Sequence, residues 1–348
     1  MNQLNSTIST CWRSPSNIAF IKYWGKIKGQ YPKNPSISMT LNEAYTETRL
    51  TASPRGNSVA GNIELFLDGK LNTAFSERII KLLPVLLPHF PFLSQVDLRI
   101  DTTNTFPHSS GIASSASGFS ALALCLCSIE EIISGNINPD FYQKASFIAR
   151  LGSGSACRSL YPGITIWGSH PSVEGSTNEF AIPLKNLHPV FSGLRDAILL
   201  VDTGEKKVSS SKGHERMDLH PFGQARIMQA FDNISILMTA LAEGDIPRFI
   251  SIIENEAMSL HALMMTSDPG FILMEPETVR MINLIKHKRE TDKLPICFTL
   301  DAGPNIHLIY FEKDHEQVRK FIVEDLLQNN KQNNWIDDKI GTGPKKIV

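Results

Sequence analysis

The segment PHSSGIASSASG, residues 107–118, comes just before the apolar run ALALCLCSIEEII, residues 121–133. A loop of small residues exposes backbone N–H groups, and the helix that follows adds partial positive charge at its N-terminus. The segment contains neither GK[ST] nor GxGxxG, the two common phosphate-loop motifs. The residues alone therefore leave two interpretations open, a phosphate-binding loop or an ordinary serine-rich turn that caps a helix.

Outward from this segment, strand-like and helix-like patterns are interleaved, which predicts an α+β fold rather than a doubly wound parallel sheet. A new buried strand begins after a stretch with Pro and Gly, so we place a boundary near residue 190 and expect domains at 1–190 and 191–348. The first domain is predicted to contain strands at 17–23, 36–41, 63–67, 96–100 and 164–167 and helices at 76–87 and 114–133. The second is predicted to contain strands at 195–202, 296–300 and 306–311 and helices at 220–242, 246–264, 277–289 and 315–328.

The composition argues against several functional classes. Among 348 residues, 34 are basic and 35 acidic, and the lack of a dense basic run argues against a nucleic-acid binder. The five cysteines are scattered without metal-ligand spacing, which suits reduced thiols. The N-terminus lacks the apolar centre of a secretory signal, and we expect no apolar run of about 18 residues. We therefore expect a cytoplasmic protein that binds no membrane.

A second loop, GSGSACRS at 152–159, places Ser153, Ser155 and Arg158 close together. Two hydroxyls and a guanidinium suit a carboxylate or a phosphate, but a flexible turn with a solvated arginine fits the sequence equally well. A serine-hydrolase elbow is disfavoured, because GSGSA does not match GxSxG. A Cys157 nucleophile is also disfavoured, because no histidine is placed by the sequence to activate it.

Three charged residues near apparent strand ends have more than one interpretation. Asp301 follows ICFTL and precedes a tight turn, so it either caps its own backbone or projects into a cleft as a general base. Lys22 lies in or at the end of a buried strand, where its charge needs an anionic partner. Lys26 is four residues further on, and simple solvent exposure is the usual fate of lysine.

Taken together, these segments resemble the diphosphomevalonate decarboxylases of the GHMP kinase superfamily, in order and approximate spacing over essentially the whole chain. The motifs IKYWGK, GSGSACRS and DAGPN are more specific than the Gly/Ser loop, which the wider superfamily shares. The matching segments are SPSNIAFIKYWGK, NPSISMTL, FPHSSGIASSASGFSALA, RLGSGSACRSLYPG, VSSSKG and FTLDAGPNIHLIY.

The resemblance implies a two-lobed GHMP fold, commonly a homodimer, with the active site in the cleft between the lobes. It implies an ATP-dependent enzyme of the mevalonate pathway, which phosphorylates the 3-hydroxyl of mevalonate 5-diphosphate and decarboxylates it to isopentenyl diphosphate. Alternatives are a mevalonate 3-kinase, a phosphomevalonate decarboxylase or a non-catalytic GHMP-like sensor. The expected ligands are ATP, Mg²⁺ and this small substrate, without nucleic acid.

By the same resemblance, Asp301 orients or deprotonates the 3-hydroxyl beside Lys22, and Arg158 holds the substrate carboxylate. Ser155 is also expected to be catalytic. The implied substrate contacts are Tyr23, Lys26, Ser153, Ser155, Arg158, Ser209 and Ser210. The implied nucleotide contacts are Ser109, Ser110, Gly111, Ile112, Ala113, Ser114 and Ser115, with Ser115 also facing the metal.

Several positions depart from the family's pattern. Pro35 stands where relatives often have Ser, and residues 108–110 replace a smaller, less polar trio. Ser211 stands where bacterial relatives can carry a diphosphate-binding Arg, which bears on the length of the substrate's phosphate tail.

Overall fold

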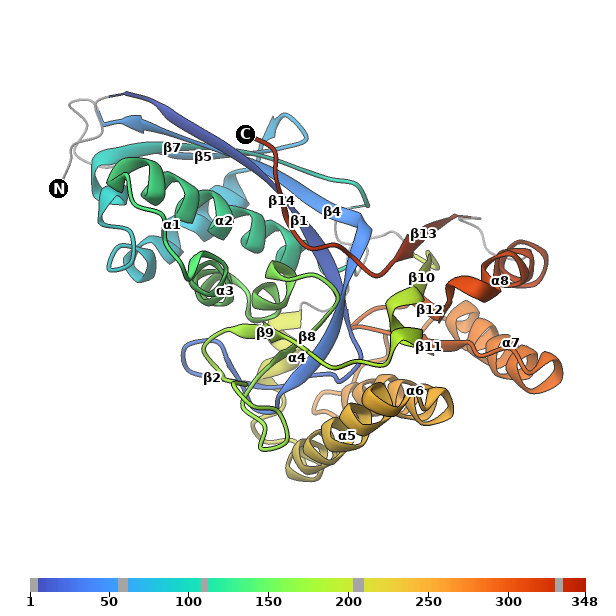
Figure 1. Cartoon of the computed structure of the whole chain (residues 1–348). Helices are drawn as coiled ribbons and strands as arrows, with labels where there is room; N and C mark the ends of the chain where they lie inside the picture. Colours follow the sequence, from blue (N-terminus) through green and yellow to red (C-terminus); the bar gives the residue numbers. More distant parts are fainter. Residues whose placement is uncertain (1–5, 56–61, 108–111, 203–209, 329–333) are drawn as a thin grey trace.

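The computed structural model describes residues 6–55, 62–107, 112–202, 210–328 and 334–348, without the side chains of residues 210–212. It has an α+β architecture with two lobes, each built on its own sheet (Figure 1). The predicted fold class is confirmed. The boundary near residue 190 stays a prediction.

The first lobe is an eight-stranded sheet with helices packed on it (Figure 1). Its main strand order is β14-β1-β4-β7-β5-β6, while β8 pairs with β4 and β9 pairs with β8. The strands are β1 (Ile8–Ala19), β4 (Ser36–Pro54), β5 (Ile63–Leu67), β6 (Lys70–Leu71), β7 (Val96–Asn104), β8 (Ile164–Trp167), β9 (Ala181–Pro183) and β14 (Lys345–Lys346). The helices are α1 (Thr73–Leu86), α2 (Ser114–Ser134), α3 (Phe141–Gly152) and the short 3-10 segments η1 (Pro91–Gln95) and η2 (Gly154–Leu160). A small hairpin, β2 (Lys26–Ile27) and β3 (Tyr31–Pro32), lies beside this lobe.

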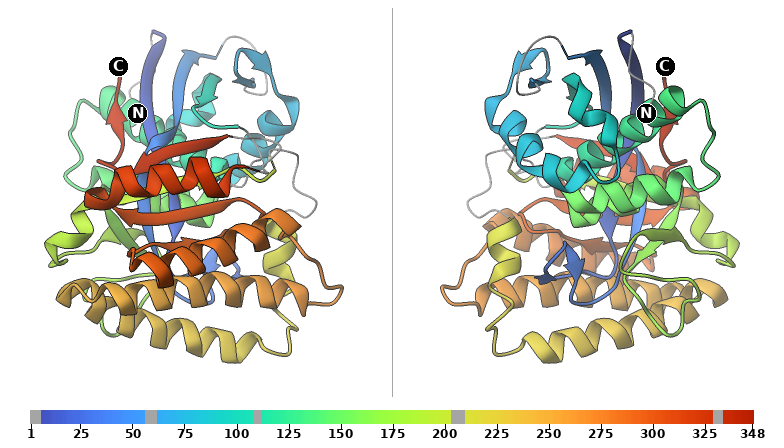
Figure 2. Two further views of the ribbon diagram at one scale, coloured as in Figure 1. Left: turned by 90° about the vertical axis from the view of Figure 1, so that its right-hand side faces the viewer. Right: turned by 90° about the vertical axis from the view of Figure 1, so that its left-hand side faces the viewer.

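The second lobe is a four-stranded sheet in the order β11-β12-β10-β13. The strands are β10 (Leu194–Leu199), β11 (Cys297–Thr299), β12 (Ile306–Phe311) and β13 (Trp335–Lys339). The helices are α4 (Ser210–Glu215), α5 (Gly223–Glu243), α6 (Ile246–Met265), α7 (Pro276–Asp292) and α8 (His315–Phe321), with short helical segments η3 (Pro189–Gly193), η4 (Glu312–Asp314) and η5 (Ile322–Leu326). Figure 2 shows α5 and α6 running side by side along one end of the molecule.

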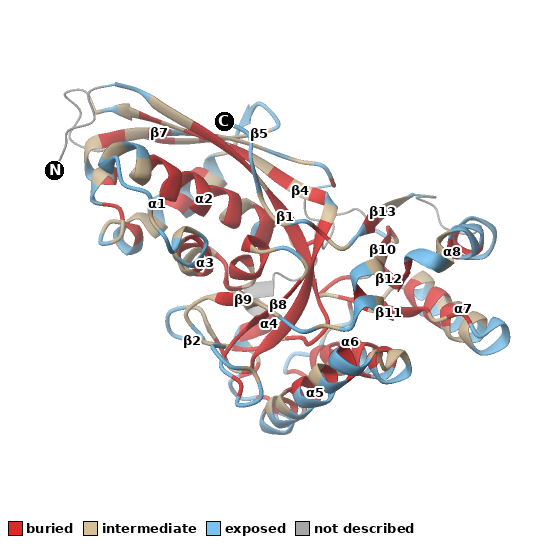
Figure 3. Ribbon diagram, viewed as in Figure 1, coloured by how far each residue is buried: buried red, intermediate tan, exposed pale blue. Residues whose placement is uncertain are grey.

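One apolar core joins the two lobes. Ile18 and Met39 of the first sheet belong to the same buried cluster as Ile198 of β10 and Ile253 of α6. Figure 3 shows the buried positions running along β1 and β4 toward the second lobe. The chain end also returns to the first lobe, because β14 pairs with β1. The lobes are therefore packed together rather than tethered by a linker.

The structure shifts the first predicted strand. Residues 17–23 were expected to be a strand, but β1 covers Ile8–Ala19. Phe20 and Ile21 both donate their backbone N–H to the carbonyl of Ile37, at 2.8 and 3.1 Å, so the regular ladder ends there. The chain then leaves the sheet, and Lys22 lies just beyond its end.

Helix α2 differs from the expectation that the chain has no apolar stretch long enough to span a membrane. Among the described helices, α2 is long enough and apolar enough to cross a membrane, judged by length and composition alone. However, 67% of the apolar window is buried inside the protein, where the helix packs on β1, β4 and α3. We therefore interpret α2 as a core helix.

Candidate active site

A salt bridge between Lys22 and Asp301 lies where the two lobes meet. Lys22 follows β1, and Asp301 follows β11 after one further buried residue. The Lys22 Nζ donates to Asp301 Oδ1 at 2.8 Å. The Lys22 side chain is 2% exposed and that of Asp301 is 30% exposed, so the carboxylate is the accessible member of the pair.

The electrostatics of this pair keep Asp301 ionised. Burial alone would raise the pKa of the Asp301 carboxyl, but the charge and hydrogen bond of Lys22 outweigh it and hold the pKa below its ordinary value. Burial lowers the pKa of Lys22, and the nearby carboxylate partly offsets this effect. An ionised, partly accessible carboxylate can accept a proton or a hydrogen bond from a substrate hydroxyl.

Arg158 is a buried cation close to this pair. Its side chain donates to the Ser36 hydroxyl, and its guanidinium lies 5.6 Å from the centre of the Tyr23 ring. It forms no ion pair with any carboxylate of the described residues, and its buried Nε finds no hydrogen-bond partner there. Burial lowers the pKa of Arg158, which is what desolvation without a full counter-charge produces. The positive charge of Arg158 would therefore be stabilised by a bound anion.

Tyr23 and Lys26 continue from Lys22 along the same segment. The Tyr23 ring stacks on His214 at 4.8 Å and meets Trp167 edge-on at 5.0 Å. Burial raises the pKa of Tyr23 to about 12, so the phenol stays protonated as a donor. Burial and then the charge of Arg78 lower the pKa of Lys26 to about 8.

The GSGSACRS loop is folded as the end of α3 followed by η2. Ser153 caps the end of α3 and is buried, and its hydroxyl lies 3.4 Å from that of Ser115 at the start of α2. Gly154 lies where the chain passes close to Trp167, because an added Cβ would be 2.7 Å from the indole Cη2. The loop is thus an ordered element that packs on α2, with Ser153 at the start of that helix, and not a solvated turn.

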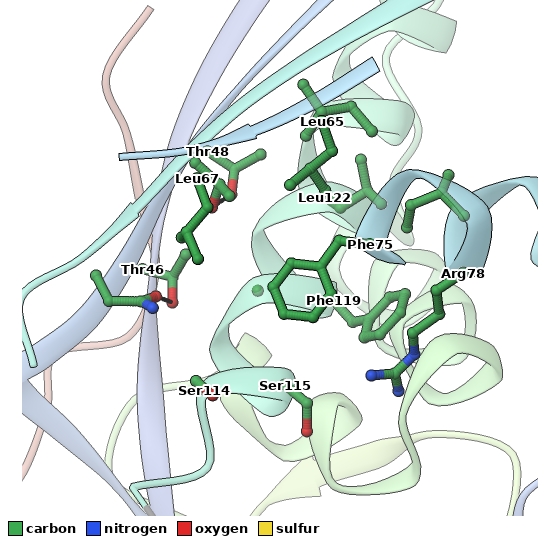
Figure 4. Close-up of a pocket in the computed structure, with 15 residues that line it drawn as sticks. Thr46, Thr48, Leu65, Leu67, Phe75, Arg78, Ser114, Ser115, Phe119 and Leu122 are labelled. Atoms are coloured by element: carbon green, nitrogen blue, oxygen red, sulfur yellow. Dashed lines mark hydrogen bonds between the residues drawn. The ribbon is translucent and has the colours of Figure 1, made fainter. Parts of the chain in front are cut away.

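A cavity of about 190 Å³ opens beside the start of α2. Figure 4 shows Leu65, Phe75 and Leu122 at its apolar end, and Ser115 and the head group of Arg78 at its polar end. Arg78 also donates to the carbonyl of Gly152 at 3.2 Å. A flat apolar ring fits the first end and phosphates fit the second.

Not all predicted site residues can be placed. Ile112 is buried, with its carbonyl accepting from the Ser16 hydroxyl at 2.7 Å, and Ala113 precedes α2 in a left-handed conformation. Ser114 and Ser115 begin α2 and line the cavity. Ser109, Ser110, Gly111 and Ser209 lie outside the described residues, and only the backbone of Ser210, at the start of α4, is described.

The donor set at the start of α2 suits magnesium that arrives with a nucleotide. Within the described part of the chain, no three His, Cys, Asp or Glu side chains gather as a metal site. Mg²⁺ usually keeps phosphate and water ligands and needs few protein groups. Ser115, exposed at the polar end of the cavity, is placed to contribute one oxygen.

Four residues of this site were not predicted from the sequence. Ser36 contacts Arg158, Arg78 lines the cavity, and Glu256 and His261 of α6 hydrogen-bond the backbones of Lys22 and Asp301. The alternation of SISMTL indicated a strand but not which hydroxyl it would offer. The other three lie in helices without any local motif, and only the tertiary fold brings them to the site.

Comparisons with known proteins agree with this geometry. Residues 14–178 match the diphosphomevalonate decarboxylase-like N-terminal domain, and residues 197–345 match the mevalonate 5-diphosphate decarboxylase C-terminal domain. The diphosphomevalonate decarboxylase of Candida albicans is 31% identical over 329 residues, covering 89% of this chain and 86% of that protein.

Solved structures give the same result. The crystal structure of mevalonate diphosphate decarboxylase from Staphylococcus aureus is 29% identical with a TM-score of 0.85, covering 99% of this chain and 100% of that one. MDDEF in complex with MVAPP, AMPPCP and magnesium is 28% identical with a TM-score of 0.83, covering 98% and 99%.

Proposed function

The chain belongs to the diphosphomevalonate decarboxylase family, and from this premise we propose that it decarboxylates mevalonate 5-diphosphate to isopentenyl diphosphate in an ATP-dependent reaction. The reaction is a step of the mevalonate route to isoprenoids. It phosphorylates the 3-hydroxyl first, because phosphate is a far better leaving group than hydroxide.

The observation that carries this proposal is the set of charges at the lobe junction. An ionised, accessible Asp301 is paired with Lys22, and the buried Arg158 lacks a carboxylate partner in the described part of the chain. A substrate with a hydroxyl and a carboxylate on neighbouring carbons fits this set. The hydroxyl would face Asp301, and the carboxylate would supply the missing anion of Arg158.

In the first step, Asp301 orients the 3-hydroxyl and accepts its proton as the oxygen attacks the γ-phosphorus of ATP. Lys22 keeps the carboxylate ionised beforehand. In the second step the C3–O bond breaks and phosphate departs with the bonding electrons. The bond between C2 and the carboxylate then breaks, and its electron pair forms the C2=C3 double bond as CO₂ leaves. Arg158 and Ser155 hold the carboxylate while this bond aligns with the emptying orbital at C3.

ATP would bind at the cavity beside α2, with its base among the apolar side chains and its phosphates at the helix start. The cavity is small for a whole nucleotide, so the phosphates would extend out of it past Ser115 toward Ser153. When bound, Mg²⁺ neutralises part of the phosphate charge during transfer. Ser114, Ser115 and the preceding residues 109–113 are the proposed contacts.

Tyr23, Lys26 and Ser153 are the proposed contacts for the diphosphate tail, together with Ser209 and Ser210. Tyr23 stays a neutral donor, and a phosphate dianion beside Lys26 would favour its charged form. The runner-up functions, a mevalonate 3-kinase or a phosphomevalonate decarboxylase, would use the same junction without a long tail.

The substrate assignment is tested by measuring ADP and CO₂ release with mevalonate, its 5-phosphate and its 5-diphosphate. We expect kcat/KM to be highest for the diphosphate and at least tenfold lower for the monophosphate, about 1.4 kcal/mol at the transition state. Equal or better use of the monophosphate would move the assignment to the phosphomevalonate enzyme. ADP without CO₂ would indicate a 3-kinase, and neither product would indicate a sensor.

We also propose that the enzyme works in the cytoplasm as a homodimer. All five cysteines are free and buried, which suits a reducing compartment. The dimer rests on the family resemblance, and light scattering of the purified protein measures it directly.

A further inference from the structure

Helix α6 reaches both members of the Lys22–Asp301 pair through their backbones. Glu256 Oε2 accepts the backbone N–H of Lys22 at 2.8 Å, and His261 Nε2 lies 3.1 Å from the backbone carbonyl of Asp301. These two side chains are five residues apart, about 7.5 Å along the helix axis. One helix therefore contacts a residue of the first lobe and a residue of the second.

The Glu256 side of this arrangement is a closed polar network. Glu256 is fully buried and forms a two-pronged ion pair with Arg226 of α5, and Asn233 donates to its Oε1 at 2.6 Å. Arg226 Nη2 also donates to the Lys22 carbonyl at 2.9 Å. The network thus bonds both the N–H and the carbonyl of Lys22. This residue lies beyond the end of β1, where strand pairing no longer satisfies the backbone.

The His261 side acts on Asp301. Because a carbonyl only accepts, Nε2 of His261 must carry the hydrogen. His261 is 1% exposed, and burial lowers its pKa to about 4, so the ring is the neutral Nε2–H tautomer near pH 7. In the described residues, the hydrogen bond of His261 to Asp301 goes to the backbone, so the carboxylate that Lys22 pairs with remains accessible to a substrate.

From these contacts we propose that Glu256 and His261 are positioning residues, which set the distance and direction between Lys22 and Asp301 by holding their backbones on α6. The inference rests on the proposed function, because it assigns a purpose to the geometry of that site. Lys22 and Asp301 are 279 positions apart and follow strands of different sheets. A shift of either backbone would change the position of the Asp301 carboxylate relative to the substrate hydroxyl. Misplacement of a reacting group by about 1 Å can lower the rate by about 100-fold.

The test is a double-mutant cycle on the full-length protein. His261→Leu removes the hydrogen bond to Asp301, and we expect kcat for CO₂ release to fall by about 10- to 100-fold with little change in the affinity for ATP. His261→Gln keeps a donor that can reach the carbonyl and should restore most of kcat. In the Asp301→Asn background, His261→Leu should cause little further loss, because His261 acts only through Asp301.

The matched control is His170→Leu. His170 is also buried, and its Nε2 lies 3.0 Å from a backbone carbonyl, that of Phe231 on α5, away from the charge pair. The His170→Leu variant should lose about as much thermal stability as His261→Leu, while its kcat stays within about twofold of wild type. If both histidine variants lose kcat in proportion to their stability, His261 is merely structural and the proposal is overturned.

Two further results keep the proposal separable from the assigned function. An undiminished loss from His261→Leu in the Asp301→Asn background would contradict action through Asp301. Should His261→Leu fail to fold, His261→Asn, whose shorter side chain draws the donor away from the Asp301 carbonyl, replaces it in the same cycle with Asp301→Asn, where an additive loss overturns the proposal. The wild-type protein, assayed for CO₂ with the three mevalonate forms, tests the assigned function independently of any variant.

Discussion

Arg150 and Arg158 are both buried and lie eight positions apart. Their surroundings differ: Arg150 has a carboxylate partner within the protein, as a structural arginine does, and Arg158 has none in the described residues. Arg150 is 1% exposed and has Glu179 as its ion-pair partner at 3.1 Å, with the Glu179 carbonyl 2.7 Å from its Nε. Arg158 has a hydroxyl partner and a buried Nε without one in the described residues. Since a buried charge without a counter-charge is costly, we infer that the anion for Arg158 is the substrate.

This contrast predicts the behaviour of two matched substitutions. Arg158→Lys keeps a charge but loses the planar fork, so we expect kcat/KM for mevalonate 5-diphosphate to fall at least tenfold with the Kd of ATP unchanged. Arg150→Lys should lower thermal stability and leave kcat/KM within about threefold. Steady-state assays of ADP and CO₂ beside thermal unfolding separate the two. Near-normal kinetics for both Arg158→Lys and Arg158→Ala would defeat the proposed role.

The sequence predicted some of these residues for physical reasons and missed others. A buried lysine needs an anion, and the structure supplies Asp301 for Lys22. Asp301 was left between a residue that caps its own backbone and a cleft residue. In the described residues its carboxylate bonds Lys22, and the turn is closed by its backbone carbonyl, which accepts from Gly303. Ser36, Glu256 and His261 could not be predicted, because their contacts span 122, 234 and 40 positions of the chain.

Among the elements, η2 shows how a close approach fixes a binding loop. Gly154 starts this segment, and its Cα faces Trp167, which in turn contacts the Tyr23 ring. The absence of a side chain at Gly154 lets η2 lie against these aromatic rings. Ser155 and Arg158, on the same segment, are thereby held at the substrate side of the junction.

A Gly154→Ala variant tests this dependence. Its Cβ would lie 2.7 Å from Trp167 and 3.3 Å from the Tyr23 hydroxyl, so we expect a loss of about 1–3 kcal/mol in unfolding free energy. We also expect a several-fold rise in KM for mevalonate 5-diphosphate. Gly193→Ala in η3 is the control, because its Cβ would meet Glu312 at an ordinary 3.4 Å. Unchanged stability and KM in Gly154→Ala would show that η2 adjusts freely.

Element positions followed from the sequence where hydrophobic periodicity was strong. Helix α6 was predicted at 246–264 and covers Ile246–Met265, with Asp245 as its cap accepting from Arg248. Helix α3 and strands β13 and β14 were missed. Strands β13 and β14 are short and polar, and the pairing of β14 with β1, at the other end of the chain, leaves no local signal.

For the whole molecule, the two lobes share a core and divide the reactive groups between them. Lys22 and Arg158 come from the first lobe, and Asp301 and helix α6 come from the second. The fold class was predictable from interleaved patterns and from the motifs that resemble a family. The packing of the lobes was not predictable, because it depends on which apolar faces meet and not on the sequence pattern within either lobe.

In the proposed reaction, phosphorylation of the 3-hydroxyl precedes decarboxylation. It is tested most directly with mevalonate 5-diphosphate carrying ¹⁸O in that hydroxyl, incubated with the enzyme and ATP, followed by mass analysis of the released inorganic phosphate. We predict that the hydroxyl oxygen leaves with the phosphate, giving one labelled phosphate for each CO₂ and each ADP. Unlabelled phosphate released together with CO₂ would mean that water, not the substrate hydroxyl, attacked ATP, and would contradict this mechanism.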